Sequence, residues 1–267
     1  MKLIESGMVL LDLDDDGVAH LRLNRPEAAN GMNVPFLRAL YDAVMVATGQ
    51  RGLRALLLTG EGSHFCAGGD VKTFAAKGEA LPDYLREATA WLQNVAQGLL
   101  ALPVPVITAV HGFAAGGGGL GLVCASDLVV AAESARFMSG AVRVGMAPDA
   151  GSSATLPQLV GVRKAMEILL LNPTLTATEA AEIGLITRVV PDDELQRTAL
   201  DMARTVADGA PRALGATKRL VWSGLGHRVE AQLPEEARTV SELSGTADAR
   251  EGLAAVLERR RPTFTGT

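Results

Sequence analysis

Two glycine-rich segments, each directly after an apolar run, constrain this chain more than any other feature. Residues 64–70 (HFCAGGD) follow the apolar run 53–59, and residues 112–121, with four consecutive glycines, follow the run 104–110. Both runs read as buried strands. Because glycine has no Cβ, such loops let the backbone come close to a ligand. Two of them are able to aim two backbone N–H groups at one oxygen, which is the geometry of an oxyanion hole that stabilises an enolate.

The composition limits the class of protein. The 267 residues are 48% apolar, which supports one sizeable core, and the net charge of −5 provides no cationic surface of the kind that nucleic acid requires. The two cysteines, Cys66 and Cys124, give neither a disulfide framework nor zinc spacing. Neither a signal-peptide stretch nor a run of about 18 apolar residues free of glycine and charge is present. We expect a cytoplasmic protein that binds no nucleic acid, membrane or metal.

The apolar pattern predicts α/β structure first and mostly helices after about residue 150. The expected strands are 8–13, 18–23, 53–59, 104–110, 127–132 and 186–190, with a hairpin turn at Asp14-Asp15-Asp16-Gly17. The expected helices are 35–48, 83–102, 161–171, 178–183, 192–207, 210–222, 235–243 and 247–259, and Thr176 is placed to cap the fourth. We divide the chain into an α/β core, 1–200, and a C-terminal helical region, 201–267.

An ordered set of motifs resembles the enoyl-CoA hydratase/isomerase superfamily, also called the crotonase family. The motifs are 21–26 (LRLNRP), 65–70 (FCAGGD), 117–122 (GGGLGL), 145–151 (GMAPDAG), 180–186 (AAEIGLI) with 189–190 (VV), and 259–264 (RRRPTF). They span nearly the whole chain. The resemblance implies an α/β fold, a crotonase-type ββα spiral with two roughly perpendicular sheets. It also implies a helical C-terminal region that builds a homotrimer or a dimer of trimers.

The resemblance further implies an acyl-CoA thioester as substrate, so that coenzyme A is part of the substrate and no separate cofactor is needed. The adenine end would lie along the first loop, and the thioester carbonyl would accept N–H bonds from Gly69 and one glycine of the second loop. The implied substrate-binding residues are Arg25, Ala67, Gly68, Gly69, Asp70, Val71, Lys72, Gly117 and Gly118. Arg25, Lys72 and Lys218 are candidates for the CoA phosphates, with a solvated surface position as the alternative, and Asp70 is also a candidate helix cap.

The register of the second loop has two solutions, because the spacing from Gly112 to Asp127 is one residue longer than is usual in the family. Counting back from 120–122 makes Gly118 the oxyanion donor, and counting forward from Gly112 makes it Gly117. We prefer Gly118, because everything downstream then aligns without a gap.

The chain departs from the family's hydratases, which carry two glutamates that hold and activate water. Their positions correspond here to Gly121 (or Leu120 in the other register) and Ala141. A different carboxylate, Asp149, falls where some isomerases of the family carry their single catalytic acid. One carboxylate suffices to move a proton from C2 to C4 of a 3-enoyl-CoA, and an apolar pocket would raise its pKa towards a useful value.

The predicted function is therefore a shift of the double bond of an enoyl-CoA, with Asp149, Gly69 and Gly118 as catalytic residues. The alternatives are a hydratase with an unidentified base and an inactive CoA-binding paralogue. Asp149 is also a candidate turn residue or cap for a helix that starts near Gly151. Residues 116–121 also fit the dinucleotide fingerprint G-x-G-x-x-G, but no acidic residue follows at the end of a next strand.

Overall fold

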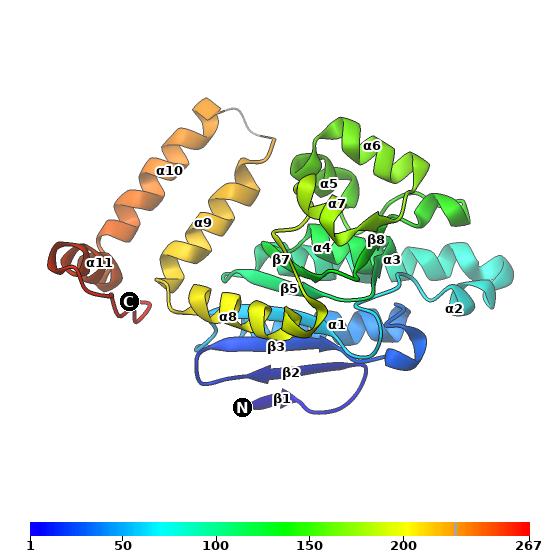
Figure 1. The fold of residues 1–267 in the computed structure, drawn as a ribbon, viewed down its shortest axis with the longest axis horizontal. Helices are drawn as coiled ribbons and strands as arrows, with labels where there is room; N and C mark the ends of the chain where they lie inside the picture. Colours follow the sequence, from blue (N-terminus) through cyan, green and yellow to red (C-terminus); the bar gives the residue numbers. More distant parts are fainter. Residues whose placement is uncertain (227–228) are drawn as a thin grey trace.

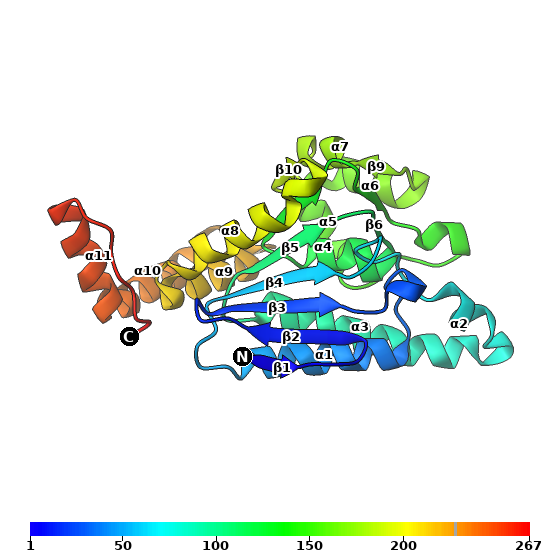
Figure 2. The ribbon, with the colours of Figure 1, turned by 60° about the horizontal axis from the view of Figure 1, so that its bottom comes forward.

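Within residues 1–226 and 229–267, which this computed structural model describes, the strands form a seven-stranded and a three-stranded sheet (Figures 1 and 2). The large sheet has the order β1 (Lys2–Ile4), β2 (Val9–Leu13), β3 (Val18–Leu23), β4 (Ala55–Gly60), β5 (Val106–Val110), β7 (Leu128–Ala132) and β10 (Arg188–Val190). Strands β1, β2 and β3 pair antiparallel, and every pair from β3 to β10 is parallel.

The small sheet is built from short strands that the sequence pattern did not predict. Strand β6 (Phe113–Ala115) pairs in parallel with β8 (Arg136–Met138), which pairs antiparallel with β9 (Leu175–Thr176). The expectation that 186–190 is the only strand after residue 150 is therefore wrong. Strand β6 directly precedes the four glycines, so this small sheet fixes the start of the second loop.

Helices cover both faces of the large sheet. Helices α1 and α3 lie on one face, and α8 packs on the other (Figures 1 and 2). The helices are α1 (Val34–Thr48), α2 (Val71–Ala75), α3 (Leu81–Ala101), α4 (Leu122–Cys124), α5 (Ser152–Val160), α6 (Val162–Leu171), α7 (Ala177–Glu182), α8 (Leu195–Ala207), α9 (Pro211–Gly224), α10 (Val229–Ser244) and α11 (Ala247–Glu258). The expected domain boundary at residue 200 falls within α8, and α10 and α11 project away from the body (Figure 1).

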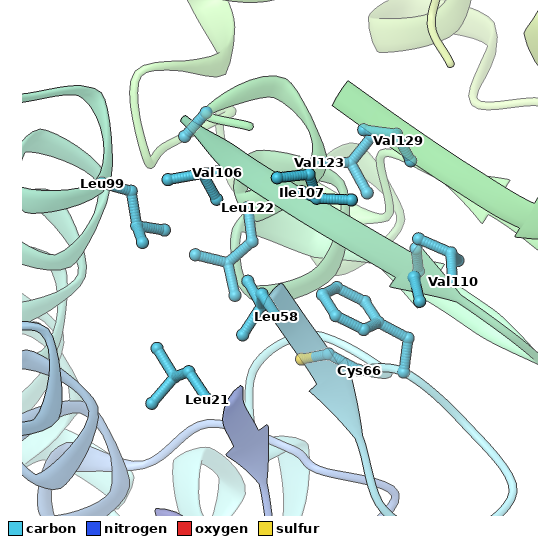
Figure 3. Close-up of a cluster of buried hydrophobic side chains, with 14 of the residues drawn as sticks. Leu21, Leu58, Cys66, Leu99, Val106, Ile107, Val110, Leu122, Val123 and Val129 are labelled. Carbon is cyan, nitrogen blue, oxygen red and sulfur yellow. The ribbon is translucent and has the colours of Figure 1, made fainter. Parts of the chain in front are cut away.

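The core explains why the two apolar runs became central strands. All side chains of β5 are buried, as are those of β4 from Ala55 to Thr59, because parallel strands with helices on both faces have no solvent-facing side. Leu58, Ile107, Leu99 and Leu122 meet in one cluster that also includes Cys66 of the first glycine loop (Figure 3). The loop is thus anchored in the core.

Most other expected elements are present with ends shifted by a few residues. The hairpin of β2 and β3 closes at Asp14, whose carboxylate accepts hydrogen bonds from the N–H groups of Asp16 and Val18. Thr176 and Glu179 form a capping box at the start of α7, as the spacing predicts. Among the described residues, no helix is both long and apolar enough to cross a membrane.

Candidate active site

The first glycine loop is joined to two distant segments by isolated β-bridges. Gly69 pairs with Met32 through bonds from Met32 N–H to Gly68 O (2.8 Å) and from Asp70 N–H to Met32 O (2.9 Å). Cys66 pairs with Ala114 of β6, so the two glycine loops are linked directly. Neither bond of the first bridge uses the N–H of Gly69, and that donor is left for a ligand.

The second loop begins with a backbone conformation that only glycine adopts readily. Gly116 has φ 62° and ψ −171°, and a Cβ on it would lie 3.8 Å from the N atom of Gly69. The chain then enters a π-helix, Gly117–Gly121, which continues into α4. The first N–H groups of a helix have no partner within it, so those of Gly117 and Gly118 make no bond inside the π-helix.

The π-helix accounts for the unusual length of this loop. A π-helix holds one residue more per turn than an α-helix, and such turns often occur at functional sites. We therefore place the extra residue within 117–121. Counting back from the downstream motif then no longer decides the register, so the preference for Gly118 stays a prediction. The contacts of the two glycines differ: Gly118 is buried against sulfur atoms of Met32 and Cys66, whereas Gly117 borders Asp149.

Asp149 lies against the second loop. A Cβ added to Gly117 would be 1.7 Å from Oδ1 and 2.5 Å from Cγ of Asp149, so the carboxylate sits directly over the Cα of Gly117. The carboxylate does not cap the following helix, because the cap residue of α5 is Gly151, which makes no side-chain cap bond. Instead the Asp149 carbonyl accepts bonds from the N–H (2.9 Å) and the hydroxyl (2.7 Å) of Ser152.

The electrostatics suit a proton carrier. Burial raises the pKa of Asp149 above its ordinary value of 3.8, because the surroundings disfavour the charged form. Neither Gly121 nor Ala141 carries an acid, and the space beside Gly121 is occupied. A Cβ on Gly121 would lie 2.5 Å from the Cβ of Ala150, so that space is filled by a methyl group.

Asp70 and Arg25 brace the first loop. The Asp70 carboxylate caps α2 by accepting the N–H of Thr73 at 2.9 Å, as the sequence predicts, and pairs with Arg25 Nη2 at 2.8 Å. Arg25 Nη1 also donates to the carbonyl of Gly31 at 2.6 Å. Burial opposes the charge on Asp70, but the bonds from Thr73 and Arg25 outweigh it and lower the pKa. Much of the Arg25 guanidinium is thus engaged inside the protein.

The other implied binding residues lie along the same edge. Val71 and Lys72 form the exposed first turn of α2, and the exposed Ala67 donates its N–H to Ala29 at 3.0 Å. Gly68, with φ 100°, faces Ala115 of the second loop. Gly68, Gly69 and Asp70 are less exposed than their neighbours Ala67, Val71 and Lys72.

Lys218 has a role that neither sequence interpretation foresaw. Its ammonium is buried and pairs with Asp127 at 2.8 Å, and it donates to the carbonyls of Leu99 and Val104 at 2.7 and 3.2 Å. Trp222 donates to the same carboxylate at 2.7 Å. Lys218 is therefore neither solvated nor a phosphate ligand, and it anchors α9 on the body.

A groove of about 1270 Å³ lies elsewhere, between α9, α10 and the ends of α1 and α3. Its lining includes Lys218, Trp222 and Arg212, and it includes neither the glycine loops nor Asp149. This groove lies apart from both loops and from Asp149, so it is not part of the candidate site. We therefore take the two glycine loops as the candidate active site, because Asp149 lies against the second loop and that loop contacts the first.

Comparisons with known proteins agree with this geometry. Residues 14–267 match the model of the enoyl-CoA hydratase/isomerase family. A Rhodobacter capsulatus protein named probable enoyl-CoA hydratase is 41% identical over 251 residues, covering 94% of this chain and 95% of the relative. The 1,2-epoxyphenylacetyl-CoA isomerase of Escherichia coli is 38% identical, covering 94% of this chain and 96% of the relative.

Solved structures agree as well. The crystal structure of enoyl-CoA hydratase from Bacillus anthracis superposes with a TM-score of 0.92 at 31% identity, covering 98% of this chain and all of that one. The fold and the paired loops define an acyl-CoA enzyme of the crotonase class. The chain belongs to the enoyl-CoA hydratase/isomerase family, which confirms the fold and the family that the motifs predict.

Proposed function

We propose that the protein shifts the double bond of an enoyl-CoA. The thioester carbonyl accepts hydrogen bonds from the N–H of Gly69 and from Gly118 or Gly117. Asp149 removes a proton from C2 of a 3-enoyl-CoA, and the electron pair delocalises into a dienolate whose oxygen lies in the hole. The same carboxyl returns the proton at C4, so the double bond ends between C2 and C3. No redox partner or separate cofactor takes part.

The observation that carries this proposal is the carboxylate of Asp149 over the Cα of Gly117. An acid there is beside the candidate oxyanion donors, where C2 of a bound thioester lies. Each oxyanion donor is typically worth about 2.7–4 kcal/mol of transition-state stabilisation. A positioned acid–base group contributes about 10²–10⁴-fold in rate.

Hydration is the alternative, because relatives carry both hydratase and isomerase names. Gly121 and Ala141 stand where hydratases of the family carry glutamates, and neither residue is able to hold or activate water, which disfavours hydration. An inactive CoA-binding paralogue is the third possibility. Both alternatives are outcomes of the same experiment.

The test uses purified protein with 3-enoyl-CoA and 2-enoyl-CoA substrates. Isomerisation of 3-enoyl-CoA is followed by the rise in ultraviolet absorbance as the conjugated 2-enoyl-CoA forms. Hydration is followed by the fall in the same absorbance as 2-enoyl-CoA is consumed. We expect isomerisation, and a loss of about 10²–10⁴-fold in Asp149→Asn with little change in acyl-CoA affinity. Asp193→Asn, at an exposed position, is the matched control. Rapid hydration by the parent would favour a hydratase, and binding without turnover would favour the inactive paralogue.

We also propose that the chain assembles as a homotrimer or a dimer of trimers. The C-terminal helices expose large apolar side chains, with Leu253, Val256 and Leu257 at 69%, 77% and 84% exposure, and Val162 of α6 is 69% exposed. Apolar surface of this kind typically marks an interface between proteins. Sedimentation equilibrium measures the mass, and a monomer at micromolar concentration would contradict the proposal.

A further inference from the structure

The segment 25–32, between β3 and α1, grips the first glycine loop along its whole length. We call this segment the clamp. Besides the bridge between Met32 and Gly69, the clamp carbonyl of Ala29 accepts the N–H of Ala67. The guanidinium of Arg25 pairs with Asp70. The position of the loop is thus set by a segment that lies well before it in the sequence.

Asn30 is the centre of the clamp. It is fully buried, and its Nδ2 group contacts the carbonyl oxygens of Glu61 (2.9 Å), His64 (2.9 Å) and Phe65 (3.0 Å). Its Oδ1 accepts the N–H of Arg25 at 2.8 Å. One side chain therefore ties the turn at the start of the clamp to the strand end from which the loop emerges.

The backbone of Asn30 continues the connection towards the oxyanion donor. The Cys66 thiol donates to the Asn30 carbonyl at 3.1 Å, and the N–H of Gly68 donates to the Cys66 sulfur at 3.4 Å. Burial raises the pKa of this thiol to about 12, so it keeps its proton and stays a donor. Gly69 follows directly after Gly68. An unbroken series of contacts thus runs from Asn30 to the residue whose N–H is left unused.

The chemistry of asparagine fits this place better than that of any close substitute. The residue has φ 54°, a left-handed conformation that asparagine tolerates better than most residues. Its amide both donates and accepts, as the three carbonyls and the Arg25 N–H require. An aspartate of the same shape would place a carboxylate against three carbonyl oxygens, and the strand end would have to move.

We propose that Asn30 is a positioning residue for the oxyanion hole, which fixes where the N–H of Gly69 points. This inference rests on the proposed function, in which that N–H binds the thioester carbonyl. Asn30 touches no substrate, so its loss acts on catalysis through the loop. A displacement of about 1 Å at a reacting group is enough to cost about 10²-fold in rate.

The experiment compares Asn30→Asp with the matched control Asn24→Asp. Asn24 directly precedes the clamp, but its Nδ2 donates to the carbonyl of Gly7 at 2.8 Å, away from the loop. Difference infrared spectroscopy of bound butyryl-CoA reports the polarisation of the thioester carbonyl. We expect N30D to lose most of the shift and about 10–100-fold in kcat, with KM nearly unchanged. N24D keeps both parental values.

A second variant guards against misfolding. Cys66→Ala removes the thiol link and leaves the Asn30 side chain in place, and we expect a smaller loss of the carbonyl shift. Parental polarisation in folded N30D overturns the inference. If N30D does not fold, C66A decides, and an unchanged shift there overturns it as well. A parent that shows the carbonyl shift without isomerisation contradicts only the proposed reaction, whereas a parent that binds butyryl-CoA without any shift contradicts both.

Discussion

Replacing Gly117 by alanine tests the placement of the proposed acid without touching any ionisable group. The new methyl group would fall 1.7 Å from Oδ1 of Asp149, 2.5 Å from Cγ and 3.0 Å from Oδ2. Ordinary contact requires about 3.5 Å. The whole carboxylate must therefore withdraw by more than about 1 Å, while the N–H groups of the loop stay in place.

The size of the effect follows from that displacement. A misplacement of about 1 Å costs about 10²-fold, so kcat for isomerisation should fall by about that factor. The KM should change little, because the first loop and the CoA contacts are untouched. Helical propensity favours alanine over glycine, which helps the variant to fold.

Gly52→Ala is the matched control, since it makes the same change where a Cβ would meet no atom within 4 Å. Gly52 lies outside both glycine loops. The rate should therefore stay at the parental value in G52A. Stopped-flow measurement of the conjugated product gives kcat for both variants, and circular dichroism verifies that they fold.

A double-mutant cycle identifies the route of the effect. If G117A acts through the carboxylate, it should cost little more in an Asp149→Asn background, because the acid is already absent. A folded G117A with the parental rate would refute the reasoning. An equal loss in both backgrounds would also refute it, since the methyl group would then act on something other than Asp149.

Three further predictions concern pH and stability. The folded state holds the Asp149 proton more tightly than the unfolded state does, because the pKa of Asp149 is raised on folding. The kcat should therefore fall as the pH drops through this raised pKa, whereas the free energy of unfolding should fall as the pH rises through the same range. The D149N variant should lose activity and have a higher Tm, which calorimetry at pH 7 tests. The pH dependence of stability has the opposite sign for Asp70, because its pKa is lowered and the stability that it contributes is lost as the pH falls. At neutral pH, Asp70→Ala should lower the free energy of unfolding by about 1 kcal/mol in urea titrations, and an unchanged midpoint would contradict the proposal that Asp70 holds the first loop. Lys218→Met removes the cation from the half-buried Asp127 carboxylate, which keeps only its bonds from Trp222 and the Val106 N–H. This change should cost about 3 kcal/mol, part of it recovered by adding Asp127→Asn, and no loss in chemical denaturation would show that the pair does not anchor α9.

The parts of the fold that are periodic along the chain were predictable from the sequence. The apolar runs that became β4 and β5 and the hairpin turn at Asp14 are local signals, and the structure contains all three. Helix α3 begins at Leu81 rather than Asp83, because Pro82 suits the first turn of a helix. Strand β6 has only three residues, too few for any period, and exists through its pairing with β8.

The candidate site was predictable only where motifs carry it. The glycine loops and Asp149 follow from family motifs, and the extra residue in the second loop was visible as a spacing. Its accommodation as a π-helix was not, because that depends on packing. The burial of Lys218 depends on Asp127, far along the chain. A lone asparagine such as Asn30 has no sequence signature, since its partners lie at 61–65.

The bridges that hold the first glycine loop in place also have a consequence for the order of folding. The hairpin of β2 and β3 forms between neighbours in the sequence, whereas the Met32–Gly69 and Cys66–Ala114 bridges close long stretches of chain. Closing such stretches lowers the chain entropy before the new contacts offset that loss, and non-local pairing is therefore slow. During refolding from denaturant, we therefore expect helical and sheet signals to recover first. Catalytic competence would return last, when the final bridge closes.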